Sequence, residues 1–72
     1  MARETSVTGR ITATGPDTIT VTHQGRDTTV DIRPAYGSYY QDPAVGDIVH
    51  VTGEQRHSGP DIDAYEITDV ER

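Results

Sequence analysis

The feature that most constrains this chain is a regular alternation of small or β-branched apolar residues with polar ones. Between residues 5 and 14 (TSVTGRITAT), Val7, Gly9, Ile11 and Ala13 alternate with threonine and arginine. Apolar residues at every second position share one face of a β-strand, whereas a helix needs a spacing of three or four. Because valine, isoleucine and threonine also favour strands, this segment predicts a strand with one buried face.

The same alternation recurs along the chain and predicts five strands in total. Turn residues separate these segments: GPD at residues 15–17, QG at residues 24–25, and Pro34. Glycine permits positive φ and proline cannot donate a ladder hydrogen bond, so the strands end there. The expected strands cover about residues 5–14, 17–23, 26–33, 47–55 and 61–70.

The last expected strand contains a change of phase. Ile62 and Ala64 lie on one face, whereas Tyr65 and Ile67 lie on the other. One extra residue in a strand shifts the alternation by one position, which is what a β-bulge does. A bulge near Ala64 would return both sets to the same core.

Residues 34–46 (PAYGSYYQDPAVG) hold two prolines and two glycines, which exclude a long helix. A short irregular connection, or a single helical turn around Tyr39, is expected there. Five short strands with one buried face each require closure to remove their edges. The sequence therefore predicts one all-β domain over residues 1–72, a small five-stranded Greek-key barrel, with an SH3-like barrel as the competing solution.

The expected core consists of inward-facing positions, most of them β-branched. They are Val7, Ile11, Ala13, Ile19, Val21, Val30, Ile32, Val45, Val49, Val51, Ile62 and Ile67. A small barrel with a filled interior leaves no room for the pocket of about 300 Å³ that small ligands commonly occupy.

Three segments resemble an OB-fold domain, and the resemblance covers residues 7–70. They are Gly9 within a long first strand, the hairpin from Thr18 to Ile32, and the VGDIVHVTG segment at residues 45–53. The layout is also similar to small translation initiation factors of the S1 type and to short uncharacterised OB proteins. The resemblance implies an OB-fold-like barrel whose first strand curls at the glycine. It also implies a binding face on strands two and three and the loops beside them.

Arginine is the only residue that carries a positive charge. The chain has 6 arginines and no lysine against 8 aspartates and 4 glutamates, which gives a net charge of −6, and it has 11 threonines. This composition resembles that of proteins from extreme halophiles. At about 1 M salt the Debye length falls to about 3 Å, so an acidic surface costs little self-repulsion. A high-GC genome, which also favours arginine over lysine, is the alternative explanation.

Sequence signatures of catalysis are absent. Without cysteine there is no disulfide framework, thiol nucleophile or cysteine-based zinc site. No serine lies in a G-x-S-x-G context, and no glycine-rich phosphate loop occurs. His23, His50 and His57 are interpreted as surface residues, with His57 beside Asp61 as the one pair to check for a cation. We therefore expect no enzyme, no cofactor and no metal.

No apolar run approaches the roughly 18 residues of a membrane span, so no membrane partner and a cytoplasmic location are expected.

Tyr36, Tyr39 and Tyr40 are three of the four aromatic residues and lie within five positions of each other. Three interpretations stay open. They can form a stacking platform for unpaired bases, which is worth about 1–3 kcal/mol per base. They can instead plug the open end of the barrel, or form a dimer contact, because tyrosine is enriched at interfaces.

Arginines lie on or beside the face that the resemblance assigns to ligand. Arg26 and Arg33 belong to the third strand, Arg10 to the first, and Arg56 to the loop that follows the fourth. Arginine and threonine suit phosphate contacts. The alternative is ion pairing of Arg26 or Arg33 with Asp31, which is worth about 0–1 kcal/mol at a surface.

Together these observations predict a non-catalytic OB-fold binding module for single-stranded DNA or RNA. The alternative is a protein-interaction or homo-oligomerisation module, as a homodimer or in a larger complex, that uses the tyrosine loop or an edge strand. The expected nucleic-acid-binding residues are Arg10, Arg26, Arg33, Tyr36, Tyr39, Tyr40, Arg56 and His57.

If the acidic surface is an adaptation to salt, stability must rise with ionic strength. We expect thermal melts to give a higher Tm in molar KCl than in dilute buffer, because screening weakens repulsion among the 12 carboxylates. Equal stability in both buffers would contradict the halophilic interpretation and favour the genome-composition explanation.

Overall fold

The computed structural model describes residues 3–35, 43–56, 59 and 61–71. Its elements are β1 (Arg3–Thr14), β2 (Thr18–His23), β3 (Arg26–Asp31), the 3-10 turn η1 (Arg33–Ala35), β4 (Ile48–Gln55) and β5 (Ile62–Glu71). The predicted all-β class and its five strands are confirmed, and each strand boundary lies close to its expected position. The described part of the chain forms no helix long and apolar enough to cross a membrane.

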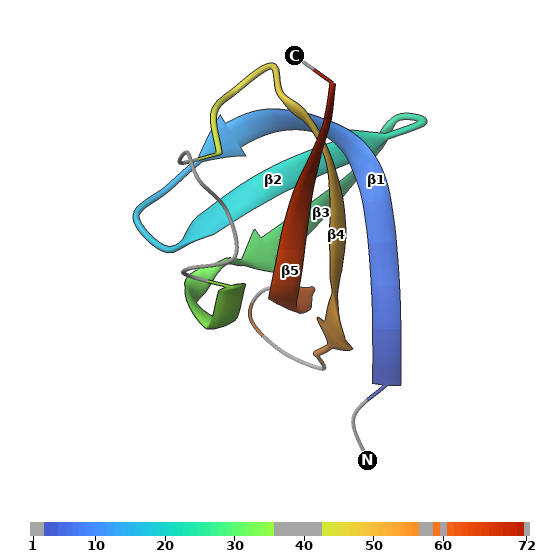
Figure 1. The fold of residues 1–72 in the computed structure, drawn as a ribbon, viewed down its shortest axis with the longest axis vertical. Coiled ribbons are helices and arrows are strands. Elements are labelled where there is room, and N and C mark those ends of the chain that lie inside the picture. The colour runs from blue at the N-terminus through green and yellow to red at the C-terminus, as the bar shows by residue number, and fades with distance from the viewer. Residues whose placement is uncertain (1–2, 36–42, 57–58, 60, 72) are drawn as a thin grey trace.

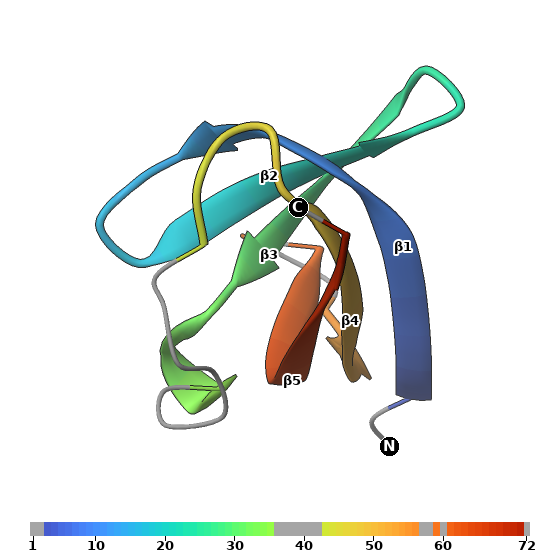
Figure 2. The same ribbon diagram turned by 45° about the horizontal axis from the view of Figure 1, so that its top comes forward.

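The five strands form a closed ring in the order β1-β2-β3-β5-β4, and β1 curves round one side of it (Figures 1 and 2). β1 pairs antiparallel with β4 over Arg3 to Arg10, and with β2 over Arg10 to Thr14. The β2–β3 hairpin and the β4–β5 pair are also antiparallel. β3 and β5 run parallel and pair only at Val30–Ile62 and Asp31–Asp63.

The change of partner along β1 depends on Gly9, which precedes the point where β2 joins. A Cβ at this position would clash with the backbone carbonyl of Thr22 on β2. Gly53 on β4 has the same role, since a Cβ there would clash with the Asp63 carbonyl of β5. Both glycines permit a close backbone approach that any side chain would block.

Eleven buried apolar residues form one core inside the ring, and Val7 packs partly against it. They are Ile11, Ile19, Val21, Val30, Ile32, Ala35, Val49, Val51, Ile62, Ala64 and Ile67. Nine of these were predicted, and the additional ones are Ala35 of η1 and Ala64 of β5.

The prediction of a buried side chain is wrong for two residues, Ala13 and Val45. Ala13 is exposed because the β1–β2 register shifts between Ile11 and Ala13, which makes Thr12 a bulged residue and turns Ala13 outward. Val45 is 62% exposed because it lies in the turn before β4. The alternation in the sequence therefore continues past the point where the structure interrupts it.

The bulge expected near Ala64 is confirmed. Thr52 pairs with Glu66 whereas Gly53 pairs with Ala64, so Tyr65 is the extra residue of β5. As a result Ala64 and Ile67 are both buried, and Tyr65 is 49% exposed.

Among the described residues between the third and fourth strands, one helical turn is present, η1, and it directly follows β3. β3 ends at Asp31, and the amide of Ala35 donates to the carbonyl of Ile32 at 3.0 Å. Tyr36, Tyr39 and Tyr40, and the helical turn expected around Tyr39, lie outside the described residues.

Replacing Gly53 by alanine tests the close approach of β4 to β5. We expect Gly53→Ala to lower the free energy of unfolding by about 1–3 kcal/mol, because the new Cβ meets backbone atoms that cannot rotate away. Gly15→Ala is the matched control, since its nearest neighbour is the Thr18 hydroxyl at 3.2 Å, which can rotate. Urea denaturation of both variants at one salt concentration measures the difference in their free energies of unfolding. Equal losses of stability in the two variants would show that the close approach of β4 to β5 at Gly53 does not need a glycine.

Candidate functional site

The structure places four of the eight predicted site residues. Arg10 lies on β1, Arg26 begins β3, Arg33 begins η1 and Arg56 directly follows β4. Only Arg33 and Arg56 are brought together. The remaining predicted residues lie outside the described part of the chain; they are Tyr36, Tyr39, Tyr40 and His57.

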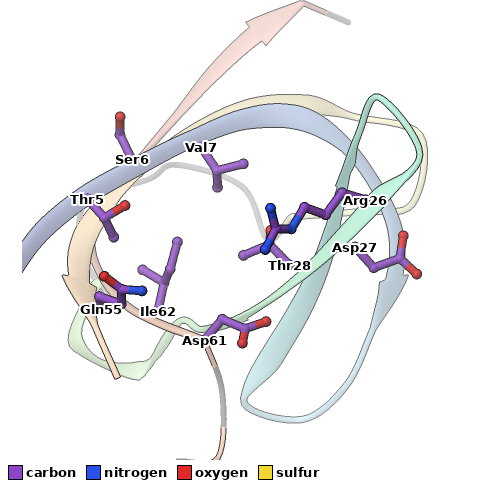
Figure 3. A pocket seen from close by; sticks show the side chains of 9 residues that line it. All are labelled: Thr5, Ser6, Val7, Arg26, Asp27, Thr28, Gln55, Asp61 and Ile62. Atoms are coloured by element: carbon purple, nitrogen blue, oxygen red, sulfur yellow. The ribbon is translucent and has the colours of Figure 1, made fainter. Parts of the chain in front are cut away.

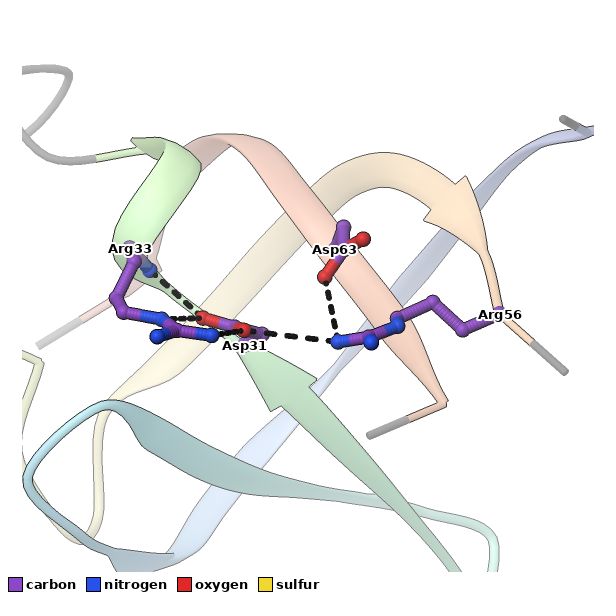
Figure 4. A network of polar contacts seen from close by, with 4 residues as sticks. All are labelled: Asp31, Arg33, Arg56 and Asp63. Atoms are coloured by element: carbon purple, nitrogen blue, oxygen red, sulfur yellow. Dashed lines mark hydrogen bonds and ion pairs between the residues drawn. The ribbon is translucent and has the colours of Figure 1, made fainter. Parts of the chain in front are cut away.

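Asp31 is the centre of a polar network at the end of β3 (Figure 4). Its side chain is only 4% exposed and accepts three hydrogen bonds from Arg33. The backbone N–H and Nε of Arg33 donate to Oδ1 at 3.0 and 3.1 Å, and Nη2 donates to Oδ2 at 2.7 Å. A carboxylate this well bonded can stay charged although it is buried.

Arg56 joins the network from the other side. Its Nη1 lies 3.2 Å from Oδ1 of Asp63 on β5 and 3.7 Å from Oδ2 of Asp31. Two guanidinium groups therefore face two carboxylates, and the charges balance. The ion pair between Arg33 and Asp31, one of the alternatives from the sequence, is present. The Arg33 side chain nevertheless stays 60% exposed.

The network shifts the pKa of both Asp31 and Arg33 in the direction that favours their charged forms. The side-chain hydrogen bond from Arg33 is the main reason that the pKa of Asp31 lies below its ordinary value of 3.8; burial opposes this, and the charges of Arg33 and Arg56 add to it. The same bond raises the pKa of Arg33. Because the folded state lowers the pKa of Asp31, the carboxylate stabilises the fold above its ordinary pKa, and this contribution is lost as the pH falls through the lowered value.

Threonines form a strip on the outer face of β2 and β3. The threonine strip consists of Thr18, Thr20, Thr22 and Thr29, which alternate with buried Ile19, Val21 and Val30.

The register places charged residues at both ends of the threonine strip. Thr22 lies between Arg10 of β1 and Asp27 of β3, and it donates to Asp27 Oδ1 at 2.7 Å. At the other end Thr18 pairs with Asp31. The carboxylate of Asp31 forms ion pairs with both Arg33 and Arg56. The strip therefore runs between Arg10 and the arginine pair.

A pocket of about 350 Å³ opens at one end of the ring (Figure 3). Val7 and Ile62 provide apolar lining, and Arg26, Thr28 and Gln55 provide polar groups. Figure 3 shows the Arg26 side chain directed toward this pocket. Asp27, the next residue of β3, pairs with Thr22 of the threonine strip, so Arg26 lies on the opposite face of the sheet. The expectation that no pocket of this size exists is wrong, because β2 pairs with β1 only from Arg10 onward and leaves the first half of β1 uncovered.

Asp61 has a structural role that its sequence context did not indicate. Its Oδ2 accepts from the backbone N–H of Thr29 at 3.0 Å, and its own N–H donates to the Thr29 carbonyl at 2.8 Å. These bonds continue the short β3–β5 pairing by one residue. The suggested pair of Asp61 with His57 involves a residue outside the described part. Among the described residues, no three histidine, aspartate or glutamate side chains gather as a metal site.

Comparison with protein-family models, curated proteins and solved structures finds no match for this chain.

Neutralising Asp31 tests the network. We expect Asp31→Asn to lower the free energy of unfolding at pH 7 by about 1–3 kcal/mol, because the charge-assisted bonds from Arg33 are weakened. The loss should shrink as the pH falls from about 3.8 through the lowered pKa of the folded state, below which the native carboxylate is itself protonated. Glu66→Gln, at an exposed carboxylate of β5, is the control and should change little. A pH-independent difference between Asp31→Asn and the native chain in urea melts would argue against the electrostatic role.

Proposed function

We propose that this chain is a non-catalytic binding module of the OB-fold type and that its ligand is single-stranded nucleic acid. An OB fold is a five-stranded Greek-key barrel that binds oligonucleotides on its second and third strands and the adjoining loops. The ring order β1-β2-β3-β5-β4 and the curved β1 support this assignment.

The observation that carries the proposal is the threonine strip with arginines at both ends. From Thr18 to Thr22 the strip spans about 13 Å, at about 3.3 Å per residue. Arg10 lies at one end, and Arg33 and Arg56 lie at the other. Hydroxyl groups and guanidinium groups are the usual partners of phosphate and sugar oxygens, so a short stretch of backbone can follow β2.

Acidic side chains near the strip have partners that reduce their repulsion of phosphate. Asp31 and Asp63 are paired with Arg33 and Arg56, and Asp27 accepts from Thr22. Arg10 has no carboxylate partner in the described part of the chain, so it can contact phosphate without breaking an existing bond.

The charge of the chain shapes the binding that we propose. With a net charge of −6, few counterions are released, and the salt dependence should reflect only the three arginines of this face. Stacking on Tyr36, Tyr39 and Tyr40 would supply affinity that salt does not weaken. We place this activity in a cytoplasm rich in salt, where the acidic surface is screened.

Fluorescence anisotropy with labelled oligo-dT and oligo-U at several salt concentrations tests the proposal. We expect a Kd tighter than about 100 μM for at least one of them, which is the upper end of non-specific binding. Thr20→Val and Arg10→Ala should each weaken binding about fivefold, equivalent to about 1 kcal/mol.

Matched controls lie on the same strands or at the same burial. Arg3→Ala removes another exposed arginine of β1, and Thr52→Val removes another half-buried hydroxyl from β4. Both should leave the Kd unchanged. No binding tighter than about 100 μM at any salt concentration would refute the proposal.

A further inference from the structure

The first half of β1 has a strand on one edge only. Residues Arg3 to Arg10 pair with β4, but pairing with β2 begins only at Arg10. From Arg3 to Gly9 the other edge of β1 therefore lacks a strand within the described residues. Figures 1 and 2 show this half of β1 at the outer margin of the molecule.

The hydrogen bonds of Ile11 identify the backbone groups on the open edge. The N–H of Ile11 donates to the Asp47 carbonyl at 2.9 Å, and its own carbonyl accepts from Gly46 at 2.8 Å, so Ile11 faces the β4 side. Successive residues of a strand direct these groups to opposite sides. Glu4, Ser6 and Thr8 therefore direct their N–H and C=O groups toward the open edge.

Within the described residues, little in this segment protects the edge against another strand. Natural proteins protect open edges with charged side chains, above all lysine, or with proline, a bulge or a covering loop. Between Arg3 and Gly9 there is no lysine, no proline and no bulge in the pairing with β4, and the charged side chains are Arg3 and Glu4. The open edge of β3 is different, because Asp61 bonds to the backbone of Thr29 on it. Of these two edges, the one on β1 is the less protected.

We propose that two copies of this chain associate by antiparallel pairing of their β1 edges about a two-fold axis at Ser6. Ser6 is the midpoint of the three residues with open backbone groups. In this register Ser6 faces the partner's Ser6, and Glu4 faces the partner's Thr8, which forms about six backbone hydrogen bonds. A shift toward Arg10 is blocked because Arg10 already pairs with Thr22 of β2.

The side chains along this edge are complementary to a second copy. Ser6 and Thr8 are exposed on the outer face and are small, and no like charges face each other directly in this register. Glu4 lies diagonally opposite the partner's Arg10 on the same face, within reach of long side chains. The two-fold axis repeats this pair, so the interface gains two opposite-charge contacts.

Pairing also covers apolar surface. Thr5 and Val7 point toward the pocket and only partly bury their side chains in the single chain. In the proposed register the partner's Val7 lies beside Thr5 on the same face of the sheet, over the pocket mouth. The edge pairing therefore completes the burial of Val7.

The association should strengthen with salt. Each copy carries a net charge of −6, so two copies repel in dilute buffer, and molar salt screens this repulsion. This dependence is opposite to that of phosphate binding, and Ser6 is not part of the threonine strip. The two proposals share Arg10, but their opposite salt dependence and the Ser6 variants distinguish the failure of one from the failure of the other.

Sedimentation velocity on the full chain, from about 10 μM to about 1 mM, tests the association. We expect a dimer whose fraction rises with protein concentration and between dilute buffer and molar KCl. A monomer at every concentration and salt would overturn the proposal.

Single cysteines test the register, because the natural chain has none. Ser6→Cys should form a disulfide-linked dimer on mild oxidation, since facing residues of antiparallel strands lie about 5.5 Å apart between Cα atoms. Thr68→Cys, at an exposed position of β5, is the control and should stay monomeric on gels. Equal cross-linking of both variants would overturn the register.

Ser6→Lys introduces the charge that protects natural edges and places like charges opposite each other. We expect this variant to sediment as a monomer while its circular dichroism stays native, and Thr68→Lys to remain a dimer. Persistent dimerisation of a folded Ser6→Lys variant would refute the edge pairing. If Ser6→Lys does not fold, the cross-linking of Ser6→Cys still tests whether the two β1 edges pair.

Discussion

The structure depends on one strand, β1, that pairs with two different strands along its length. It pairs with β4 along its first part and with β2 along its last part, and the exchange happens beside Gly9. A side chain at Gly9 would collide with the carbonyl of Thr22, so β2 could not approach. Without that approach the sheet would keep two open sides, and the eleven core residues would have no common interior.

Two of the three register shifts in the sheet, at Thr12 and at Tyr65, show which features of the fold a sequence can reveal. The bulge at Tyr65 is visible in advance because Ile67 follows it, out of phase with Ile62 and Ala64. The bulge at Thr12 is not visible, because β1 ends two residues later and no further apolar residue records the change of phase. The alternation therefore predicts a buried Ala13, whereas the structure exposes it, although the pattern predicts the strand itself correctly.

In the candidate site, contacts between residues near in sequence could be predicted, whereas contacts between distant residues could not. The pairing of Arg33 with Asp31 spans two positions and could be suggested from the sequence. The arrival of Arg56 beside Asp31 could not, because it depends on how the end of β4 lies against β3. The pocket was also missed, since its existence depends on where β2 stops relative to β1. Alternation predicts strands but gives no information on how far two strands overlap.

The junction of β3 and β5 has a further consequence. The two strands share only two residue pairs, yet they close the ring. Side chains reinforce this seam: Asp61 bonds to Thr29, and Arg56 lies between Asp31 of β3 and Asp63 of β5. Local opening of a protein begins where few bonds must break. Because the seam has so few backbone bonds, the guanidinium group of Arg56 holds a large share of the contacts that keep the two strands together, and the ring is expected to open first at this junction.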